Sequence, residues 1–153
     1  MRQVAFIFPG QGAQEVGMGR EFYESSPAAK TIFDQANAII KDLTSVIFDG
    51  PPEKLTSTAF CQPAIFTVCA AALKAFEAHP KFKTIDPQFA CGLSLGEYPA
   101  LVACGALSFE EAKRLFYEGS DNGKHFMNTT YRIKKYIKSF LFSWHIQHKS
   151  MNV

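Results

Sequence analysis

The strongest constraint on the fold is a glycine-bounded turn around Ser94. An apolar run at residues 88–91 leads into the letters G-L-S-L-G at 92–96, and a helical pattern continues from there to about Cys104. This is G-x-S-x-G between a strand and a helix, a context in which a serine lies on a sharp turn with its hydroxyl exposed. Only glycine lets neighbouring backbone approach such a turn closely. The pattern predicts an α/β fold with Ser94 as a candidate nucleophile, and an ordinary Gly-Ser-Gly turn is the alternative.

The rest of the N-terminal part fits the same fold class. Residues 3–8 form an apolar run that stops at a proline-glycine pair, which is typical of a buried strand. Ser26 before Pro27 predicts a helix start, because serine caps helices and proline favours their first position; apolar residues at helical spacing follow to residue 40. Residues 63–78 are apolar around most of a helical circumference, so we expect a buried helix. A capping box at Ser108 predicts a further helix, and the whole order indicates a parallel sheet.

A glycine-rich loop, F-P-G-Q-G-A-Q at 8–14, follows the first predicted strand. It contains neither G-x-G-x-x-G nor Gly-Lys-Ser/Thr, so we do not expect a nucleotide site. Its backbone N–H groups can instead be offered to an anionic oxygen, since no bulky side chains stand in the way. Ligands of open α/β sheets collect at the carboxyl ends of the strands. We therefore expect this loop to lie near Ser94.

These two motifs carry a family resemblance. The loop at 8–14, the letters G-L-S-L-G-E-Y at 92–98 and C-Q-P-A at 61–64, where the family often has T-Q-P-A, resemble the malonyl-CoA:acyl-carrier-protein transacylases over roughly residues 3–115. The resemblance implies an α/β-hydrolase-like acyltransferase core with a parallel sheet, truncated before or within the family's ferredoxin-like subdomain. It implies transfer of malonyl from malonyl-CoA to the phosphopantetheine thiol of acyl carrier protein through a malonyl-serine intermediate, in fatty acid biosynthesis. It implies no cofactor and no metal.

The resemblance also implies roles for particular residues. Ser94 matches the serine that becomes malonylated, and the backbone N–H groups of Gln11 and Leu95 match the oxyanion hole. Gln62 matches a glutamine near the substrate site, or one that only braces loops. Leu93 stands where many members carry a histidine, which is not the catalytic base.

Beyond residue 115 the sequence departs from the family. The family has an arginine in an R-G-x-x-M context, about twenty-five residues after the serine, that pairs with the malonyl carboxylate. This chain reads Y-E-G-S at 117–120, and Arg114 lies about a turn too early to replace it. The family's catalytic histidine lies in a G-x-F-H-S/T context. That context surrounds none of the three histidines of the tail, which are His125, His145 and His148.

We therefore divide the chain into the N-terminal part of a transacylase domain, residues 1–117, and a divergent aromatic-rich tail, residues 118–153. The first part holds 10 basic and 12 acidic side chains, whereas the tail holds 6 basic and 2 acidic ones. An apolar stripe within 133–144 fits a basic amphipathic helix for a membrane surface or a partner, with chance periodicity as the alternative.

A frameshift, readthrough or truncation would produce such a tail; a genuine tail is the alternative. It contains no convincing strand run, so we expect vacant sheet positions and a loosely packed, aggregation-prone product.

Cysteine usage and the N-terminal sequence favour the cytoplasm. Four cysteines lie in apolar runs without a C-x-x-C pair, and this predicts buried free thiols in a reducing compartment. The start of the chain lacks the pattern of a signal peptide, and we see no apolar stretch approaching the ~20 residues that span a bilayer. We expect a cytoplasmic monomer whose partners are malonyl-CoA and acyl carrier protein, with no nucleic acid and no membrane span.

Two other functions stay open at this point. The chain could be an inactive fragment of the transacylase, since it lacks the arginine and the histidine of the site. It could also be a serine thioesterase or hydrolase, which shares the G-x-S-x-G turn. Acyl-group selectivity, and the choice between a fatty acid and a polyketide pathway, are likewise open.

Overall fold

A computed structural model of the chain describes residues 4–85 and 87–114. All of them lie in the first of two compact units into which the chain divides, Met1–Glu118. The predicted tail, with its three histidines and its apolar stripe, falls outside the described residues. The division at residue 117 therefore stays a prediction.

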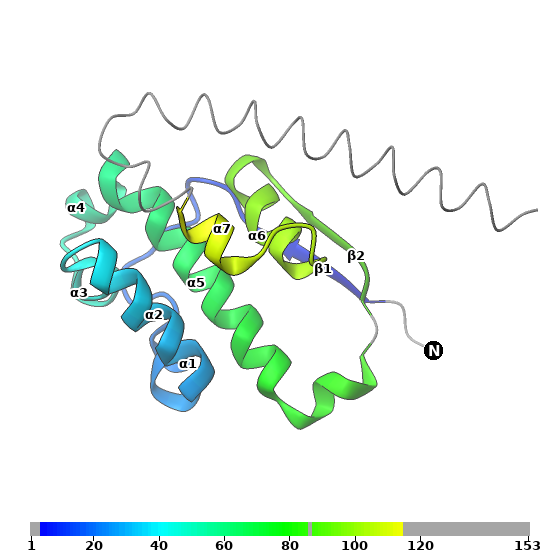
Figure 1. The fold of residues 1–153 in the computed structure, drawn as a ribbon. Helices are drawn as coiled ribbons and strands as arrows, with labels where there is room; N and C mark the ends of the chain where they lie inside the picture. The colour runs from blue at the N-terminus through cyan, green and yellow to red at the C-terminus, as the bar shows by residue number, and fades with distance from the viewer. Residues whose placement is uncertain (1–3, 86, 115–153) are drawn as a thin grey trace, which may run out of the picture. The chain divides into compact units, whose positions relative to one another are not determined.

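A parallel pair of strands forms the sheet of the described part. β1 (Val4–Phe8) pairs with β2 (Pro87–Gly92) in parallel, with Ala5 opposite Phe89 and Ile7 opposite Cys91. The strands predicted at 3–8 and 88–91 are confirmed to within a residue. A parallel pair needs a crossover connection, and a long helical segment supplies it (Figure 1). The mixed α/β class with a small parallel sheet is thus confirmed.

Helices make up most of the remaining described chain. Those in the crossover are α1 (Arg20–Ser25), α2 (Pro27–Ile39), α3 (Leu43–Asp49), α4 (Pro52–Thr56), α5 (Thr58–Ala78) and the 3₁₀ helix η1 (Pro80–Thr84). Those after β2 are the 3₁₀ helix η2 (Ser94–Gly96), α6 (Glu97–Ala103) and α7 (Phe109–Lys113).

The capping signals in the sequence mark real helix starts. Ser26 caps α2, its hydroxyl oxygen accepting a hydrogen bond of 3.4 Å from the backbone N–H of Ala29, and Pro27 is the first residue of the helix. The capping box at Ser108 is also formed, because its side chain accepts from the Glu111 N–H while the Glu111 carboxylate accepts from the Ser108 N–H. The carboxylate's hydrogen bonds to Ser108 hold the pKa of Glu111 below its usual value.

Helix α5 is longer than its apolar pattern predicts. It begins at Thr58, so Pro63 is an internal residue rather than the first one. Proline is commonest at the first helical position, so the sequence pattern predicts a start at Pro63, which is too late. By length and composition alone, Thr58–Ala78 is long and apolar enough to cross a membrane, so the expectation that no such stretch exists is wrong. Here α5 is a core helix that packs along α2, and more than half of its apolar stretch is buried.

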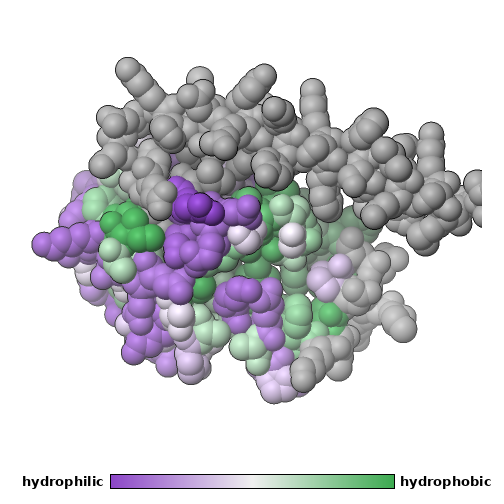
Figure 2. Space-filling model, in the orientation of Figure 1, coloured by the Kyte–Doolittle hydropathy of each residue, from purple (hydrophilic) through white to green (hydrophobic). Residues whose placement is uncertain are grey.

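The hydrophobic core lies where α2, α3 and α5 meet. The inward face of α2 buries Ala29, Ile32, Phe33 and Ala36, but Ile39, predicted on the same face, is 41% exposed because the helix ends there. On the outer side of these helices, hydrophilic residues cover much of the surface (Figure 2). This contrast between the two sides of α2 is what an amphipathic surface helix requires.

Within residues 4–85 and 87–114, only one face of the sheet is covered. Phe6 lies on the covered face, where its ring centroid is 5.7 Å from that of Phe76 on α5, and α6 packs against both strands. On the opposite face, Ile7 is 77% exposed and Phe89 is 71% exposed. Parallel strands usually have both faces covered, so this apolar face is unusual for the fold class.

The four cysteines are free, as predicted, but only two are buried. Cys61 and Cys69 lie in the core on α5, and burial raises the pKa of the Cys69 thiol to about 12. Cys91 and Cys104 are exposed, so the expectation that all four are buried is wrong. The reasons are local: Cys91 lies on the uncovered sheet face, and Cys104 follows the last residue of α6.

We expect alkylation to separate the cysteines into two pairs. Only the thiolate reacts, so a thiol whose pKa is about 12 is almost entirely unreactive at pH 8. Iodoacetamide added to the native chain should modify Cys91 and Cys104 at least about 100-fold faster than Cys61 and Cys69. Peptide mass spectrometry over a time course measures this, and denatured protein is the control. Equal rates for all four thiols in the native chain would contradict the described core.

Candidate active site

Ser94 lies on a strained turn between β2 and the following helices. Its φ is 53°, in the left-handed region that non-glycine residues seldom adopt, and the residue is exposed. The turn is held on both sides: the Leu93 N–H donates to the Phe8 carbonyl at 3.3 Å, and the Gly96 N–H donates to the Leu93 carbonyl at 2.9 Å. Backbone strain of this kind persists where the surrounding structure enforces it, and it clusters at functional sites. The predicted turn after the strand is present, but its first helical residues are 3₁₀ rather than α.

The two glycines of the motif are required by close backbone contacts. A Cβ on Gly92 would overlap the carbonyl of Gly96 and lie 2.7 Å from the backbone nitrogen of Glu97. A Cβ on Gly96 would overlap the carbonyl of Phe8, at the end of β1. The steric reason inferred from the sequence for G-x-S-x-G is therefore visible in the structure: the turn folds back on itself and onto the neighbouring strand.

We expect Gly92→Ala to destabilise the chain by about 3 kcal/mol or more, because rigid backbone atoms would have to move. Gly12→Ala is the matched control. Gly12 also needs its glycine conformation, with a φ of 104°, but a Cβ there meets nothing within 4 Å, so the expected cost is only about 1–2 kcal/mol. Chemical denaturation followed by circular dichroism compares the two variants. A Gly92→Ala variant no less stable than Gly12→Ala would show that the tight turn is not formed.

The glycine-rich loop after β1 lies against the Ser94 turn, as the sequence predicts. A Cβ on Gly10 would be 2.7 Å from the Leu93 carbonyl oxygen, so this loop touches the residue before the serine. Within the loop, the Gly12 N–H donates to the side-chain oxygen of Gln14 at 2.8 Å. Two segments about eighty residues apart in sequence thus meet at the carboxyl ends of the two strands.

The backbone N–H groups of Gln11 and Leu95 belong to these two segments. Gln11 follows Gly10 in the loop, and Leu95 follows Ser94 in the turn. Among the turn, loop and cap hydrogen bonds of residues 4–85 and 87–114, neither N–H is a donor. Neither N–H is committed to those bonds, and the oxyanion hole that the resemblance implies would need both. Their catalytic role remains a prediction.

Helix α5 contacts the loop through two neighbouring residues. The Gln62 side-chain amide donates to the side-chain oxygen of Gln11 at 3.4 Å, a long hydrogen bond in an exposed setting. The Cys61 thiol lies in the core, where burial raises its pKa. A hydrogen bond with the Gly12 backbone N–H lowers the pKa of the same thiol, but by less. Gln62 therefore lies at the site. Its contact with Gln11 fits the second of its two expected roles, in which this glutamine braces the loop. The contact between Cys61 and Gly12 was not predicted, and the sequence carries no signal for it beyond the adjacency of Cys61 to Gln62.

A partner base for Ser94 is not found among the described residues. His79 is the histidine within this part of the chain; it follows the end of α5, and its Nδ1 accepts from the Lys81 N–H at 3.2 Å. It is 17 residues from Gln62 along α5, or about 25 Å at the rise of an α-helix. Arg114 follows α7 and is exposed. The structure thus gives no reason to assign either residue to the site.

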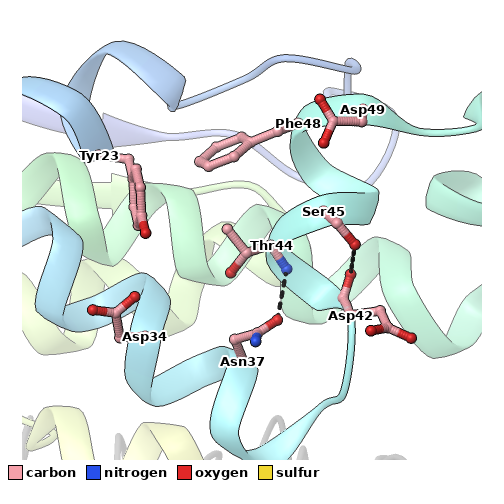
Figure 3. A pocket seen from close by; sticks show the side chains of 8 residues that line it. All are labelled: Tyr23, Asp34, Asn37, Asp42, Thr44, Ser45, Phe48 and Asp49. Atoms are coloured by element: carbon pink, nitrogen blue, oxygen red, sulfur yellow. Dashed lines mark hydrogen bonds between the residues drawn. The ribbon is translucent and has the colours of Figure 1, made fainter.

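A separate hollow of about 390 Å³ lies among α1, α2 and α3 (Figure 3). Its rim carries three carboxylates from different positions in the chain, Asp34, Asp42 and Asp49, and Ser94 does not line it. Asp49 is paired with Arg20 at 2.7 Å, but Asp34 and Asp42 still make the rim acidic, which disfavours malonyl-CoA with its anionic carboxylate and phosphates. In residues 4–85 and 87–114, no group of three or more His, Cys, Asp or Glu side chains could hold a metal ion. We therefore assign the hollow no substrate.

Comparison with known proteins relates this arrangement to a family of enzymes. Residues 5–123 match the family model described as acyl transferase domain. A malonyl CoA-acyl carrier protein transacylase of Bacillus subtilis (strain 168) is 51% identical over 113 residues, which are 73% of this chain and 34% of that protein.

Solved structures agree with the sequence comparison. The malonyl CoA-acyl carrier protein transacylase from Clostridium perfringens superposes with a TM-score of 0.66 and 37% identity, over 78% of this chain and 37% of that one. A structure of a type II PKS acyl-carrier protein in complex with its malonyl-transacylase gives a TM-score of 0.67 and 31% identity, over 78% and 38%. The chain therefore spans little more than a third of the length of these relatives.

Proposed function

The chain belongs to the acyl transferase family, and from this membership we propose that it is the nucleophile-bearing part of an acyl-carrier-protein S-malonyltransferase. The observation that carries the proposal is the Ser94 turn: an exposed serine at a φ of 53°, placed beside the glycine-rich loop by contacts that leave no room for a Cβ at either glycine of the motif. A serine held in this way presents its hydroxyl to a substrate without further rearrangement.

The proposed reaction has two acyl transfers. Ser94 Oγ attacks the thioester carbonyl of malonyl-CoA, its proton passes to a base, and the carbon–sulfur bond breaks to release CoA as the thiol. The N–H groups of Gln11 and Leu95 stabilise the negative oxygen that forms in each step. The phosphopantetheine thiol of acyl carrier protein then attacks the malonyl-serine ester, and the Ser94 hydroxyl is restored. We place this reaction in the cytoplasm and in fatty acid synthesis, with malonyl-CoA and acyl carrier protein as partners.

A chimeric enzyme tests the proposed activity. Residues 1–114 of this chain would replace the matching part of the Bacillus subtilis transacylase, so that the base and the arginine come from the relative. We expect malonyl to pass to acyl carrier protein at a rate within about tenfold of the relative's, because the two sequences are 51% identical over the exchanged part. Hydrolysis of malonyl-CoA by water is measured in the same samples. Hydrolysis that equals or exceeds transfer would reject the transferase in favour of a thioesterase.

A further inference from the structure

The loop that carries the Gln11 N–H contains a tight turn. The Ala13 N–H donates to the Gly10 carbonyl at 3.4 Å, and Gly12 has a φ of 104°, in the positive range that the third residue of a type II turn requires. Gln11 is therefore the second residue of the turn, and its N–H belongs to the peptide group that leads into it. A tilt of the whole turn would change the direction of this N–H relative to Ser94.

One contact fixes the start of the turn. A Cβ on Gly10 would be 2.7 Å from the Leu93 carbonyl oxygen, so the turn lies against the backbone of the residue before the nucleophile. A single contact fixes a position and not an orientation. The direction of the Gln11 N–H therefore also depends on the other contacts of the turn.

Helix α5 supplies such contacts through two adjacent residues. The Gln62 side-chain amide donates to the Gln11 side-chain oxygen at 3.4 Å. The Cys61 thiol accepts a hydrogen bond from the Gly12 backbone N–H. The Gly12 N–H also donates to the side chain of Gln14 at 2.8 Å, but that bond lies within the loop and moves with it. The two α5 residues are thus what ties the turn to the core.

The helix that makes these contacts is a rigid support. Cys61 is fully buried, and its backbone N–H donates to the Ser57 carbonyl at 2.8 Å, which closes the first turn of α5. The helix packs along α2 in the hydrophobic core. Groups held by a packed helix keep a site more precisely in place than groups held by a loop alone.

We propose that Cys61 and Gln62 are positioning residues, which orient the turn so that the Gln11 N–H points to the oxygen that becomes negative during attack by Ser94. The catalytic consequence rests on the proposed acyl transfer, whereas the order of the turn is a property of the chain itself. An oxyanion donor stabilises the transition state only if it already points to the developing charge, so a tilted turn slows the reaction more than it weakens substrate binding.

Two substitutions at position 61 separate the hydrogen bond from the packing. Cys61→Thr and Cys61→Val both introduce a β-branched side chain of similar shape, but only threonine has an oxygen that accepts from the Gly12 N–H. The new hydroxyl could donate to the Ser57 carbonyl, as the Thr67 hydroxyl already donates to the Pro63 carbonyl at 2.7 Å on the same helix. A difference between the two variants therefore reports the acceptor at position 61.

Two further substitutions complete the set. Gln62→Met removes the other contact, because methionine has an unbranched side chain without an amide. Cys69→Val is the matched control for a change inside the core. Cys69 is a second buried cysteine of α5, about two turns beyond Cys61, and burial alone raises the pKa of its thiol.

Nitrogen-15 relaxation in the full 153-residue chain measures how firmly the turn is held, and it needs no activity. Selective labelling of glutamine and glycine gives the order parameters of the Gln11 and Gly12 N–H groups. We expect values of about 0.8, close to those of rigid backbone, in the unsubstituted chain, in Cys61→Thr and in Cys69→Val. The values should fall toward the flexible range, below about 0.6, in Cys61→Val and in Gln62→Met.

Kinetics in the chimera of residues 1–114 with the relative's remaining segment test the catalytic consequence. Cys61→Val and Gln62→Met should each lower kcat for malonyl transfer about 10- to 100-fold, with KM for malonyl-CoA within about threefold, because the same N–H serves both acyl transfers. Cys61→Thr and Cys69→Val should keep both constants within about threefold. A chimera without any activity would reject the proposed function, and the relaxation measurement would still decide whether these residues hold the turn.

Three results would overturn the proposal. The first is a Gln11 N–H that stays equally ordered in Cys61→Val and Gln62→Met. The second is the same loss of order or of kcat in Cys61→Thr as in Cys61→Val, because the side chain at position 61 would then act by its shape. The third is a rise in KM with kcat unchanged, which would make these residues contacts of the substrate instead.

Discussion

The purified 153-residue chain is expected to transfer malonyl to acyl carrier protein about 10⁴- to 10⁶-fold more slowly than the Bacillus subtilis transacylase. A serine without its base is a weak nucleophile, and the one histidine among the described residues, His79, is held by the Lys81 N–H at the far end of α5. At 117–120 the sequence also lacks the arginine that the family resemblance implies as the partner of the malonyl carboxylate, so we expect weaker malonyl binding.

Initial rates at matched protein concentrations measure this difference, and the chimera of residues 1–114 with the relative's remaining segment is the control. The chimera should recover most of the activity because the relative's segment supplies the histidine and the arginine that the resemblance implies. If the 153-residue chain transfers malonyl as fast as the relative, a histidine of the tail serves as the base, and the interpretation of the chain as an incomplete enzyme is wrong.

In the chimera, Ser94→Ala should lower the transfer rate by about 10³- to 10⁶-fold, since the proposed malonyl-serine intermediate can no longer form. The substitution removes an exposed hydroxyl and fills no space, so stability should hardly change. A lower transfer rate would then reflect loss of the nucleophile and not loss of the fold.

Ser25→Ala is the matched control for that substitution. Ser25 is an exposed serine at the end of α1 whose hydroxyl donates to the Glu21 carbonyl at 2.6 Å. Its removal should leave the rate within about twofold. A Ser94→Ala chimera that keeps more than about a tenth of the activity would show that the malonyl group travels by another route.

The local parts of the fold were predictable because each depends on a few adjacent residues. The start of α2 at Ser26 and Pro27, the capping box at Ser108 and the strands on either side of the glycine turns all follow from steric and hydrogen-bonding rules that act over four or five positions. The nearness of the loop at 8–14 to Ser94 was predictable from the rule that sites gather at the carboxyl ends of parallel strands.

The features that the sequence mispredicted or missed are those that depend on tertiary packing. The exposure of Cys91 follows from the uncovered sheet face, and apolar neighbours in the sequence cannot reveal whether another element covers them. The predicted start of α5 is five residues late because proline favours a first position, whereas Pro63 is tolerated inside a helix that packs against α2 and α6. The contact of Cys61 with Gly12 joins a helix to a loop about fifty residues away, and such pairs are set by the fold rather than by spacing.

The most direct test of the account is the site of malonylation. The chimera would be incubated with malonyl-CoA without acyl carrier protein, its intact mass recorded, and the modified residue located by peptide mapping. The account predicts one malonyl group per chain, on Ser94, that disappears in the Ser94→Ala variant and is discharged when acyl carrier protein is added. An adduct that survives Ser94→Ala, or that maps to another residue, would contradict it.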